Sequence, residues 1–157
     1  RHPSGARIYV DYAHTPDALK TVLKALKPHV KRNLAVVFGC GGDRDKTKRS
    51  VMGEIAERLA DKIYVTDDNP RSEVPADIRA EILKGSPSGI DAGDRASAIE
   101  RAVADLQYGD VLLVAGKGHE QGQTIGEEVF DFDDVSVVRS AITTIEQSEN
   151  FDRRSVN

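Results

Sequence analysis

The chain has 157 residues, of which 39% are hydrophobic and 31% charged, and its formal net charge is -4 at pH 7. This length suits one globular domain, because a chain of this size buries about 70% of the surface that it exposes when unfolded. The acidic balance argues against nucleic-acid binding, which normally needs a basic face. No apolar run approaches the roughly 20 residues of a membrane-spanning helix, so we expect no membrane insertion.

Cysteine usage and the N-terminus bear on the compartment and on the extent of the protein. Cys40 is the single cysteine, so no disulfide can form within the chain, and we expect a cytoplasmic protein. The N-terminus lacks the apolar core of a signal peptide. The sequence begins at Arg1 without an initiator Met, and we expect it to be a piece of a longer polypeptide.

The first half of the chain alternates short apolar runs with amphipathic helical patterns. Continuous apolar runs are typical of strands that are buried on both faces of a parallel sheet. The pattern predicts a strand over Arg7 to Tyr12, a helix from Pro16 with Thr15 as its N-cap, and a strand over Leu34 to Gly39. It then predicts a helix burying one apolar face, a strand over Lys62 to Thr66, and a helix over Pro75 to Leu83. The buried face of the second helix is expected to hold Val51, Met52, Ile55, Ala56 and Leu59.

The second half continues the alternation and ends in a polar segment. A weak strand near Ile90 precedes a helix that starts near Arg95, and a strand over Asp110 to Ala115 follows. A last extended piece covers Glu128 to Phe132, and a final helix runs from Asp134 to Glu146. We expect the domain to occupy residues 1–147, followed by a polar, frayed tail over residues 148–157.

Near-strict alternation of strands and helices predicts an α/β fold with right-handed crossovers. We expect a Rossmann-like, open, mostly parallel sheet of about six strands with flanking helices. The extended piece near residues 128–132 is expected to add an antiparallel strand at one edge of this sheet.

Four polar, Gly-rich or charged segments each follow the carboxyl end of an expected strand. They are Asp11-Tyr12-Ala13-His14, Gly39 to Lys46, Asp67 to Arg71, and Gly116 to Glu120. Ligands of open α/β sheets bind at this edge. The turns at the opposite edge, over residues 27–33 and 107–109, show no comparable density of special residues. This one-sided distribution predicts a binding site.

Each segment alone also fits an ordinary structural role. Asp11 and His14 could form a turn ahead of a helix, and Gly41-Gly42 could be a tight turn. The segment from Asp68 to Arg71 has the form of a common Asn-Pro turn, and the segment after Gly116 could be a loop with solvated charges. Only the convergence of all four segments on one edge favours a site.

Neither standard phosphate-binding glycine pattern is present. A dinucleotide fingerprint needs G-x-G-x-x-G, but counted from Gly39 the third glycine position holds Arg44. A P-loop needs G-K-[ST], but Asp45 precedes Lys46-Thr47, and glycine rather than a hydroxyl residue follows Lys117. The chain therefore shows no recognisable phosphate cradle of its own.

Together, in this order and spacing, the four segments resemble the C-terminal domain of the Mur ligases, over Val10 to about Ile142. The string Asp68-Asn69-Pro70-Arg71 resembles the diaminopimelate recognition motif of the family, and lysine-adding members differ at the position of Arg71. The resemblance implies an ATP-dependent amide ligase that adds meso-diaminopimelate to UDP-N-acetylmuramoyl-L-alanyl-D-glutamate in peptidoglycan biosynthesis. It also implies an N-terminal UDP-sugar domain and a central ATPase domain outside this chain.

The resemblance also implies roles for particular residues. Contacts with meso-diaminopimelate are expected from Arg44, Asp68, Asn69, Arg71, Gly116 and Glu120. The Arg71 guanidinium suits the distal carboxylate because it can donate two parallel charged hydrogen bonds, and Glu120 suits an ammonium. Asp11 and His14 resemble residues that reach the nucleotide, and Lys46 could neutralise a phosphate. No catalytic residue and no metal ligand is expected in this domain, because the absent domains would hold ATP, Mg²⁺ and the UDP-muramyl dipeptide.

Three alternatives stay open at this point. A lysine-adding Mur ligase is disfavoured by Arg71, and a folylpolyglutamate synthetase has a similar closing domain but gives no reason for this Asn-Pro-Arg turn. A standalone amino-acid-binding module without catalysis is a different class of protein. A P-loop encoded upstream of Arg1 would favour the ligase, and a start codon there would favour the module.

Overall fold

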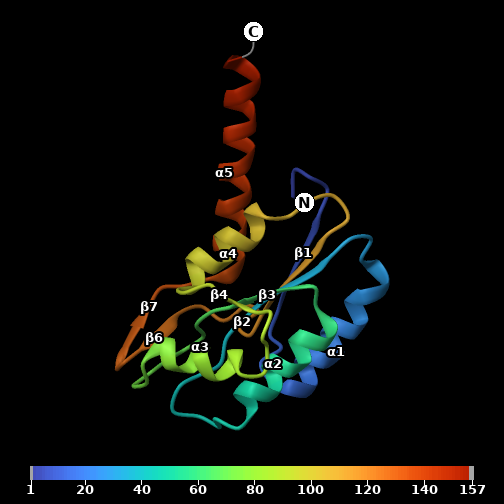
Figure 1. Ribbon diagram of the computed structural model, residues 1–157. Helices are drawn as coiled ribbons and strands as arrows, with labels where there is room; N and C mark the ends of the chain where they lie inside the picture. Colours follow the sequence, from blue (N-terminus) through green and yellow to red (C-terminus); the bar gives the residue numbers. More distant parts are fainter. Residues whose placement is uncertain (1, 156–157) are drawn as a thin grey trace.

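Five parallel strands form the central sheet of the structure, a computed structural model that describes residues 2–155 (Figure 1). Their order is β1-β5-β2-β3-β4, and each neighbouring pair is parallel. The strands are β1 (Arg7–Asp11), β2 (Leu34–Phe38), β3 (Lys62–Val65), β4 (Ile90–Asp91) and β5 (Val111–Ala115). The predicted α/β class with a mostly parallel sheet is confirmed.

Helices cover both faces of this sheet. One face is covered by α1 (Pro16–Leu26), the short 3₁₀ helix η1 (Lys27–His29) that continues it, α2 (Lys48–Leu59) and α3 (Pro75–Leu83). The other face is covered by α4 (Arg95–Ala104) and α5 (Asp134–Ser155). Because successive side chains of a strand point to opposite faces, β2 sends Leu34, Val36 and Phe38 into one core and Ala35 and Val37 into the other. This explains why β2 is apolar at every position.

The starts of two helices agree with their capping residues. The Thr15 hydroxyl accepts a hydrogen bond from the Ala18 amide at 3.2 Å, as predicted, and Asp94 accepts from the Ser97 amide at 3.0 Å. Such a cap stabilises a helix by about 1 kcal/mol. In α2 the expectation that Val51 is buried is wrong, since Val51 is 41% exposed while Met52 is buried. Val51 lies one position outside the stripe that faces the sheet.

The predicted antiparallel edge strand does not join the main sheet. Instead β7 (Glu128–Phe130) pairs with β6 (Gln123–Ile125) in a separate two-stranded antiparallel sheet. Gly126 adopts a φ of 61° in the two-residue turn between them, a conformation that glycine accepts without steric cost. The hairpin provides its own pairing partner, so the main sheet has five strands rather than about six.

The last helix is longer than expected. The sequence predicts a helix to Glu146 and a frayed tail from residue 148, but α5 continues to Ser155 and projects away from the sheet (Figure 1). Neither glycine nor proline interrupts residues 147–155, so nothing in the sequence stops the helix once it has formed. Its last ten residues are exposed. Within residues 2–155, no helix is both long and apolar enough to cross a membrane.

Arg95 is a fully buried cation at the carboxyl edge of the sheet. Its Nε and Nη2 atoms each donate to the buried Asp134 carboxylate at 2.7 Å. Nη1 donates to the Asp67 carbonyl at 3.1 Å, and Nη2 also donates to the Ala115 carbonyl at 3.0 Å. The guanidinium therefore connects the ends of β3 and β5 to the starts of α4 and α5.

Glu73 anchors the loop that follows β2. Its carboxylate accepts from Arg49 Nη1 at 3.2 Å and Nη2 at 2.7 Å, and from the Asp43 amide at 2.7 Å. Arg49, 1% exposed, also donates to the Gly41 carbonyl at 3.1 Å. The hydrogen bonds from Arg49 lower the pKa of Glu73 to about 2. The Arg49–Glu73 ion pair thus holds the loop at Gly41 and at Asp43.

The lowered pKa of Glu73 predicts a pH-dependent contribution to stability. Because folding lowers this pKa, the ionised carboxylate stabilises the fold above the ordinary value of 4.5, and this contribution is lost as the pH falls toward about 2. We expect Glu73→Gln to lower the Tm at pH 6, and the gap from wild type to narrow by pH 3. Circular dichroism melts measure the gap, with the exposed Glu100→Gln on α4 as control. A gap of constant size from pH 6 to pH 3 would contradict the anchor.

Candidate functional site

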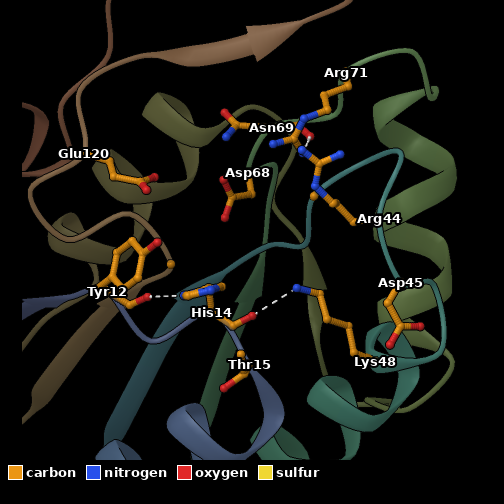
Figure 2. Close-up of a pocket in the computed structure, with 12 residues that line it drawn as sticks. Tyr12, His14, Thr15, Arg44, Asp45, Lys48, Asp68, Asn69, Arg71 and Glu120 are labelled. Carbon is orange, nitrogen blue, oxygen red and sulfur yellow. Dashed lines mark hydrogen bonds between the residues drawn. The ribbon is translucent and has the colours of Figure 1, made fainter.

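The four segments singled out in the sequence surround one cleft at the carboxyl edge of the sheet (Figure 2). The cleft has a volume of about 440 Å³. Parallel strands end at the same edge, which brings together loops that are far apart in the sequence. The lining residues are Tyr12, His14, Thr15, Gly41, Arg44, Asp45, Lys48, Asp68, Asn69, Arg71, Gly116 and Glu120.

Seven of the nine predicted site residues line this cleft, and Asp11 and Lys46 do not. Asp11 ends β1, and its carboxylate accepts the Ala13 amide at 3.1 Å, which is the turn-forming role that the sequence left open. Lys46 lies on the exposed side of its loop and pairs with Glu73 at 3.4 Å. Its charge is therefore balanced outside the cleft.

A close approach between two loops builds one wall of the cleft. A β-carbon at Gly42 would lie 1.8 Å from the Pro70 carbonyl oxygen, so only glycine fits there, and the Gly42 amide donates to the Asn69 carbonyl at 2.8 Å. On the other side, the Arg71 amide donates to the Thr124 carbonyl of β6 at 3.1 Å. The Asn-Pro turn is thus clamped from both sides.

Arg71 adopts an unusual backbone conformation within this turn. Its φ of 51° lies in the left-handed region, which costs a non-glycine residue about 1–2 kcal/mol. Such strain persists only where the surrounding structure imposes it, and it is concentrated at functional sites. The conformation directs the Arg71 side chain toward the cleft (Figure 2).

Two guanidinium groups lie together on one side of the cleft (Figure 2). Arg71 Nη1 donates to the Gly42 carbonyl at 3.0 Å and the Asn69 carbonyl at 3.4 Å. In the part of the chain that the structure describes, Arg71 Nε and Nη2 have no hydrogen-bond partner, and these two atoms form the fork that binds a carboxylate. The neighbouring Arg44 is exposed and donates to the Asp43 carbonyl at 2.9 Å. This side can bind an anionic group.

The Glu120 carboxylate occupies the other side of the cleft, whereas the lining carboxylate of Asp45 lies on the same side as Arg44. Figure 2 shows Glu120 opposite the two guanidinium groups, with Asp68 between them. The negative charge of Glu120 raises the pKa of the Tyr12 phenol. Asp68 is 9% exposed, and one of its oxygens would lie 3.0 Å from a β-carbon at Gly116. The cleft is therefore charge-separated and complements a ligand that carries both a carboxylate and an ammonium.

His14 and Lys48 line the part of the cleft beside α1 and α2. His14 Nδ1 lies 3.0 Å from the Tyr12 carbonyl oxygen, so Nδ1 must donate, and in the neutral ring Nε2 is left as an acceptor. Lys48 Nζ donates to the His14 carbonyl at 3.1 Å. Lys48 is the first residue of α2 and faces the cleft, whereas Lys46 does not.

Five of the lining residues were missed by sequence reasoning, namely Tyr12, Thr15, Gly41, Asp45 and Lys48. All except Thr15 and Lys48 lie inside the segments that were singled out. Among residues 2–155, no group of three or more His, Cys, Asp or Glu side chains is arranged to hold a metal ion.

Comparison with known proteins identifies the family. The family model described as "Mur ligase, glutamate ligase domain" matches residues 1–118. A relative from Mesorhizobium japonicum, named UDP-N-acetylmuramoyl-L-alanyl-D-glutamate--2,6-diaminopimelate ligase, is 60% identical over 139 residues, which cover 88% of this chain and 29% of the relative. A relative of the same name from Caulobacter vibrioides is 56% identical over 146 residues, which cover 93% of this chain and 30% of the relative.

A solved structure agrees with these matches. The structure of a UDP-N-acetylmuramoyl-L-alanyl-D-glutamate--2,6-diaminopimelate ligase has a TM-score of 0.86 and 45% identity, and it covers 93% of this chain and 31% of that chain. This chain thus spans 29% to 31% of the length of these three proteins. Because the family match extends over 118 of its 157 residues, the chain belongs to the Mur ligase family, in which it corresponds to the glutamate ligase domain.

Proposed function

We propose that this chain is the amino-acid-binding domain of an ATP-dependent ligase that adds meso-diaminopimelate to UDP-N-acetylmuramoyl-L-alanyl-D-glutamate during peptidoglycan synthesis. The charge-separated cleft carries this proposal, with Arg44 and Arg71 on one side and Glu120 on the other. Relatives that are 56% and 60% identical bear the name of such a ligase. Since those relatives are about three times as long, the isolated domain is expected to be inactive.

The chemistry of diaminopimelate matches the cleft. Diaminopimelate is a lysine with an additional carboxylate at its far end, so that end carries a carboxylate beside an ammonium. The fork of Arg71 binds the distal carboxylate through two charged hydrogen bonds, with Arg44 adding positive charge. The carboxylates of Asp68 and Glu120 accept hydrogen bonds from the ammonium. Asn69 and the backbone at Gly116 complete the wall between these groups.

Holding the distal end leaves the other amine free to react. In the family reaction ATP converts the glutamate carboxylate into an acyl phosphate, and the amine attacks its carbonyl, forms the amide bond, loses a proton and displaces phosphate. The residues of this domain orient the attacking amine and keep the distal amine away from the carbonyl. Such positioning is worth several kcal/mol of the reaction barrier.

We further propose that the α1 and α2 side of the cleft meets the nucleotide. His14 presents an unused ring nitrogen, and Lys48 is the better-placed cation for a phosphate than Lys46. Asp11 then acts indirectly, by forming the turn that carries His14. ATP, Mg²⁺ and the UDP-muramyl dipeptide are held mainly by the rest of the protein. A cytoplasmic location is proposed because Cys40 is a free, buried thiol, as expected in a reducing compartment.

The alternative functions have weaker support. A lysine-adding ligase would leave the Arg71 fork without a partner, at a cost of about 1–3 kcal/mol. A folylpolyglutamate synthetase gives no reason for the charge-separated cleft. A standalone binding module is disfavoured because relatives of 56% and 60% identity carry this domain as about 30% of a longer ligase.

Substitution of Arg71 in the full-length protein tests the substrate assignment. Arg71→Ala should lower kcat/KM for meso-diaminopimelate by about 10² to 10³, equivalent to about 3–4 kcal/mol for a lost bidentate charged contact. The rate with lysine should change little, because lysine lacks the distal carboxylate. Arg71→Lys should restore activity only in part, since an ammonium cannot form the fork.

The readout of the Arg71 test is the ratio of kcat/KM for diaminopimelate to kcat/KM for lysine. Arg58→Ala, which removes an exposed guanidinium from α2, is the control and should leave the ratio unchanged. If Arg71→Ala also leaves the ratio unchanged, Arg71 is only a turn residue and the substrate assignment is wrong.

Substitution of His14 tests the nucleotide side of the cleft. In the full-length protein, His14→Ala should raise the KM for ATP about tenfold, the value of one lost hydrogen bond of about 1.4 kcal/mol. The KM for diaminopimelate should stay within twofold of wild type. Steady-state kinetics with each substrate varied in turn measures both. An increase confined to the KM for diaminopimelate would refute this division of the cleft.

A further inference from the structure

Lys117 is a fully buried ammonium group that follows β5 and is not among the residues that line the cleft. Nζ donates to Asn69 Oδ1 at 2.9 Å and to the Gly122 carbonyl at 3.1 Å, and it pairs with Asp68 Oδ1 at 3.2 Å. An ammonium has three N–H donors, so these three acceptors use all of them. Two of these acceptors, Asp68 and Asn69, line the cleft.

The three acceptors belong to two different loops. Asp68 and Asn69 lie in the turn after β3, and Gly122 ends the loop that carries Glu120. β3 and β5 are not neighbours, because β2 lies between them in the sheet. Burial of an ammonium costs several kcal/mol in lost hydration, and an apolar side chain of similar size would often stabilise the fold as well. The presence of a cation here is better explained by orientation of the two loops than by stability.

The contacts of Asn69 decide which end of its amide faces the cleft. Oδ1 accepts from Lys117 Nζ and from the Thr124 backbone amide, both at 2.9 Å. Both partners can only donate, so the oxygen must face them and the Nδ2 group must face away. Asn69 lines the cleft, and its Nδ2 group is not among the buried polar atoms that lack a hydrogen-bond partner. Asn69 therefore offers the ligand hydrogen-bond donors rather than an acceptor.

Asp68, in contrast to Asn69, offers the ligand a hydrogen-bond acceptor. Its Oδ1 pairs with Lys117 Nζ at 3.2 Å, while Oδ2 lies toward Gly116, which lines the cleft. The Gln123 side chain donates to the Asp68 carbonyl at 2.7 Å and fixes the backbone of the same residue. One buried cation thus presents a donor at Asn69 and an acceptor at Asp68, which suit the carboxylate and the ammonium of an amino acid.

We propose that Lys117 is a positioning residue for amino-acid recognition, which orients the Asn69 amide and the Asp68 carboxylate without touching the ligand. This inference rests on the proposed function of the cleft. It predicts that loss of Lys117 damages amino-acid binding through Asn69 and Asp68, and leaves use of the nucleotide intact.

The test uses the full-length protein with Lys117→Met, which keeps an unbranched side chain of nearly the same length and removes the ammonium group. We expect kcat/KM for meso-diaminopimelate to fall about 10²-fold, mainly through KM, as for a misplaced binding group. The KM for ATP should stay within twofold of wild type. Tyr64→Phe is the matched control, because it removes the 2.7 Å hydrogen bond from the hydroxyl of the buried Tyr64 to Asp105, neither of which lines the cleft. It should lower the Tm without changing either KM.

A double-mutant cycle separates positioning from a general structural role. If Lys117 acts through Asn69, the variant that combines Lys117→Met with Asn69→Ala should lose much less than the product of the two single losses. Independent, multiplicative losses would overturn the proposal, as would a Lys117→Met variant with a lower Tm and unchanged kinetics. Failure of the proposed function itself would be seen separately, in an unchanged amino-acid preference of Arg71→Ala.

A second variant decides the matter if Lys117→Met does not fold. Asn69→Asp keeps an oxygen for Lys117 and Thr124 but replaces the Nδ2 group with a negatively charged oxygen that faces the ligand carboxylate. We expect a folded protein whose kcat/KM for diaminopimelate is at least about 10²-fold lower, with the KM for ATP unchanged. Normal use of diaminopimelate by Asn69→Asp would overturn the orientation on which the proposal stands.

Discussion

Burial of positive charge at the carboxyl edge of the sheet is the constraint on which the cleft depends. Arg95 holds the Asp67 and Ala115 carbonyls, and each of these residues is followed directly by one that lines the cleft. Asp134 balances the charge of Arg95 with two hydrogen bonds of 2.7 Å. Removal of either partner would leave a buried charge unpaired, which typically costs 3–5 kcal/mol. The two loops are therefore fixed before any ligand arrives.

Under the proposed function, these fixed loops let a domain of ordinary α/β architecture recognise a small zwitterion. The Arg71 fork and the Glu120 carboxylate lie on opposite sides of the cleft, and Nε and Nη2 of Arg71 have no hydrogen-bond partner among the described residues. A preorganised pair of opposite charges loses little free energy to reorganisation when the ligand binds. Under the proposed function, the contribution of this domain is to bind the amino acid and to orient its attacking amine.

Sequence patterns predicted the parts of the structure that depend on periodicity and failed where a distant contact decides. Continuous apolar runs revealed β2 and β5 because both faces of these strands are buried. β6 has three residues and pairs with the adjacent β7, which leaves no apolar signal. Which of Lys46 and Lys48 faces the cleft is decided by two features outside the segment that contains Lys46. Glu73 pairs with Lys46, and α2 begins at Lys48. Such partners become visible only when the loops are placed in space.

The most direct test of the central claim is a crystal structure of the full-length protein with meso-diaminopimelate bound. We expect the distal carboxylate to accept hydrogen bonds from Nε and Nη2 of Arg71 and from Nδ2 of Asn69. We also expect the adjacent ammonium within hydrogen-bond distance of Asp68 or Glu120. A ligand bound outside this cleft, or one whose distal carboxylate points away from Arg71, would contradict the account.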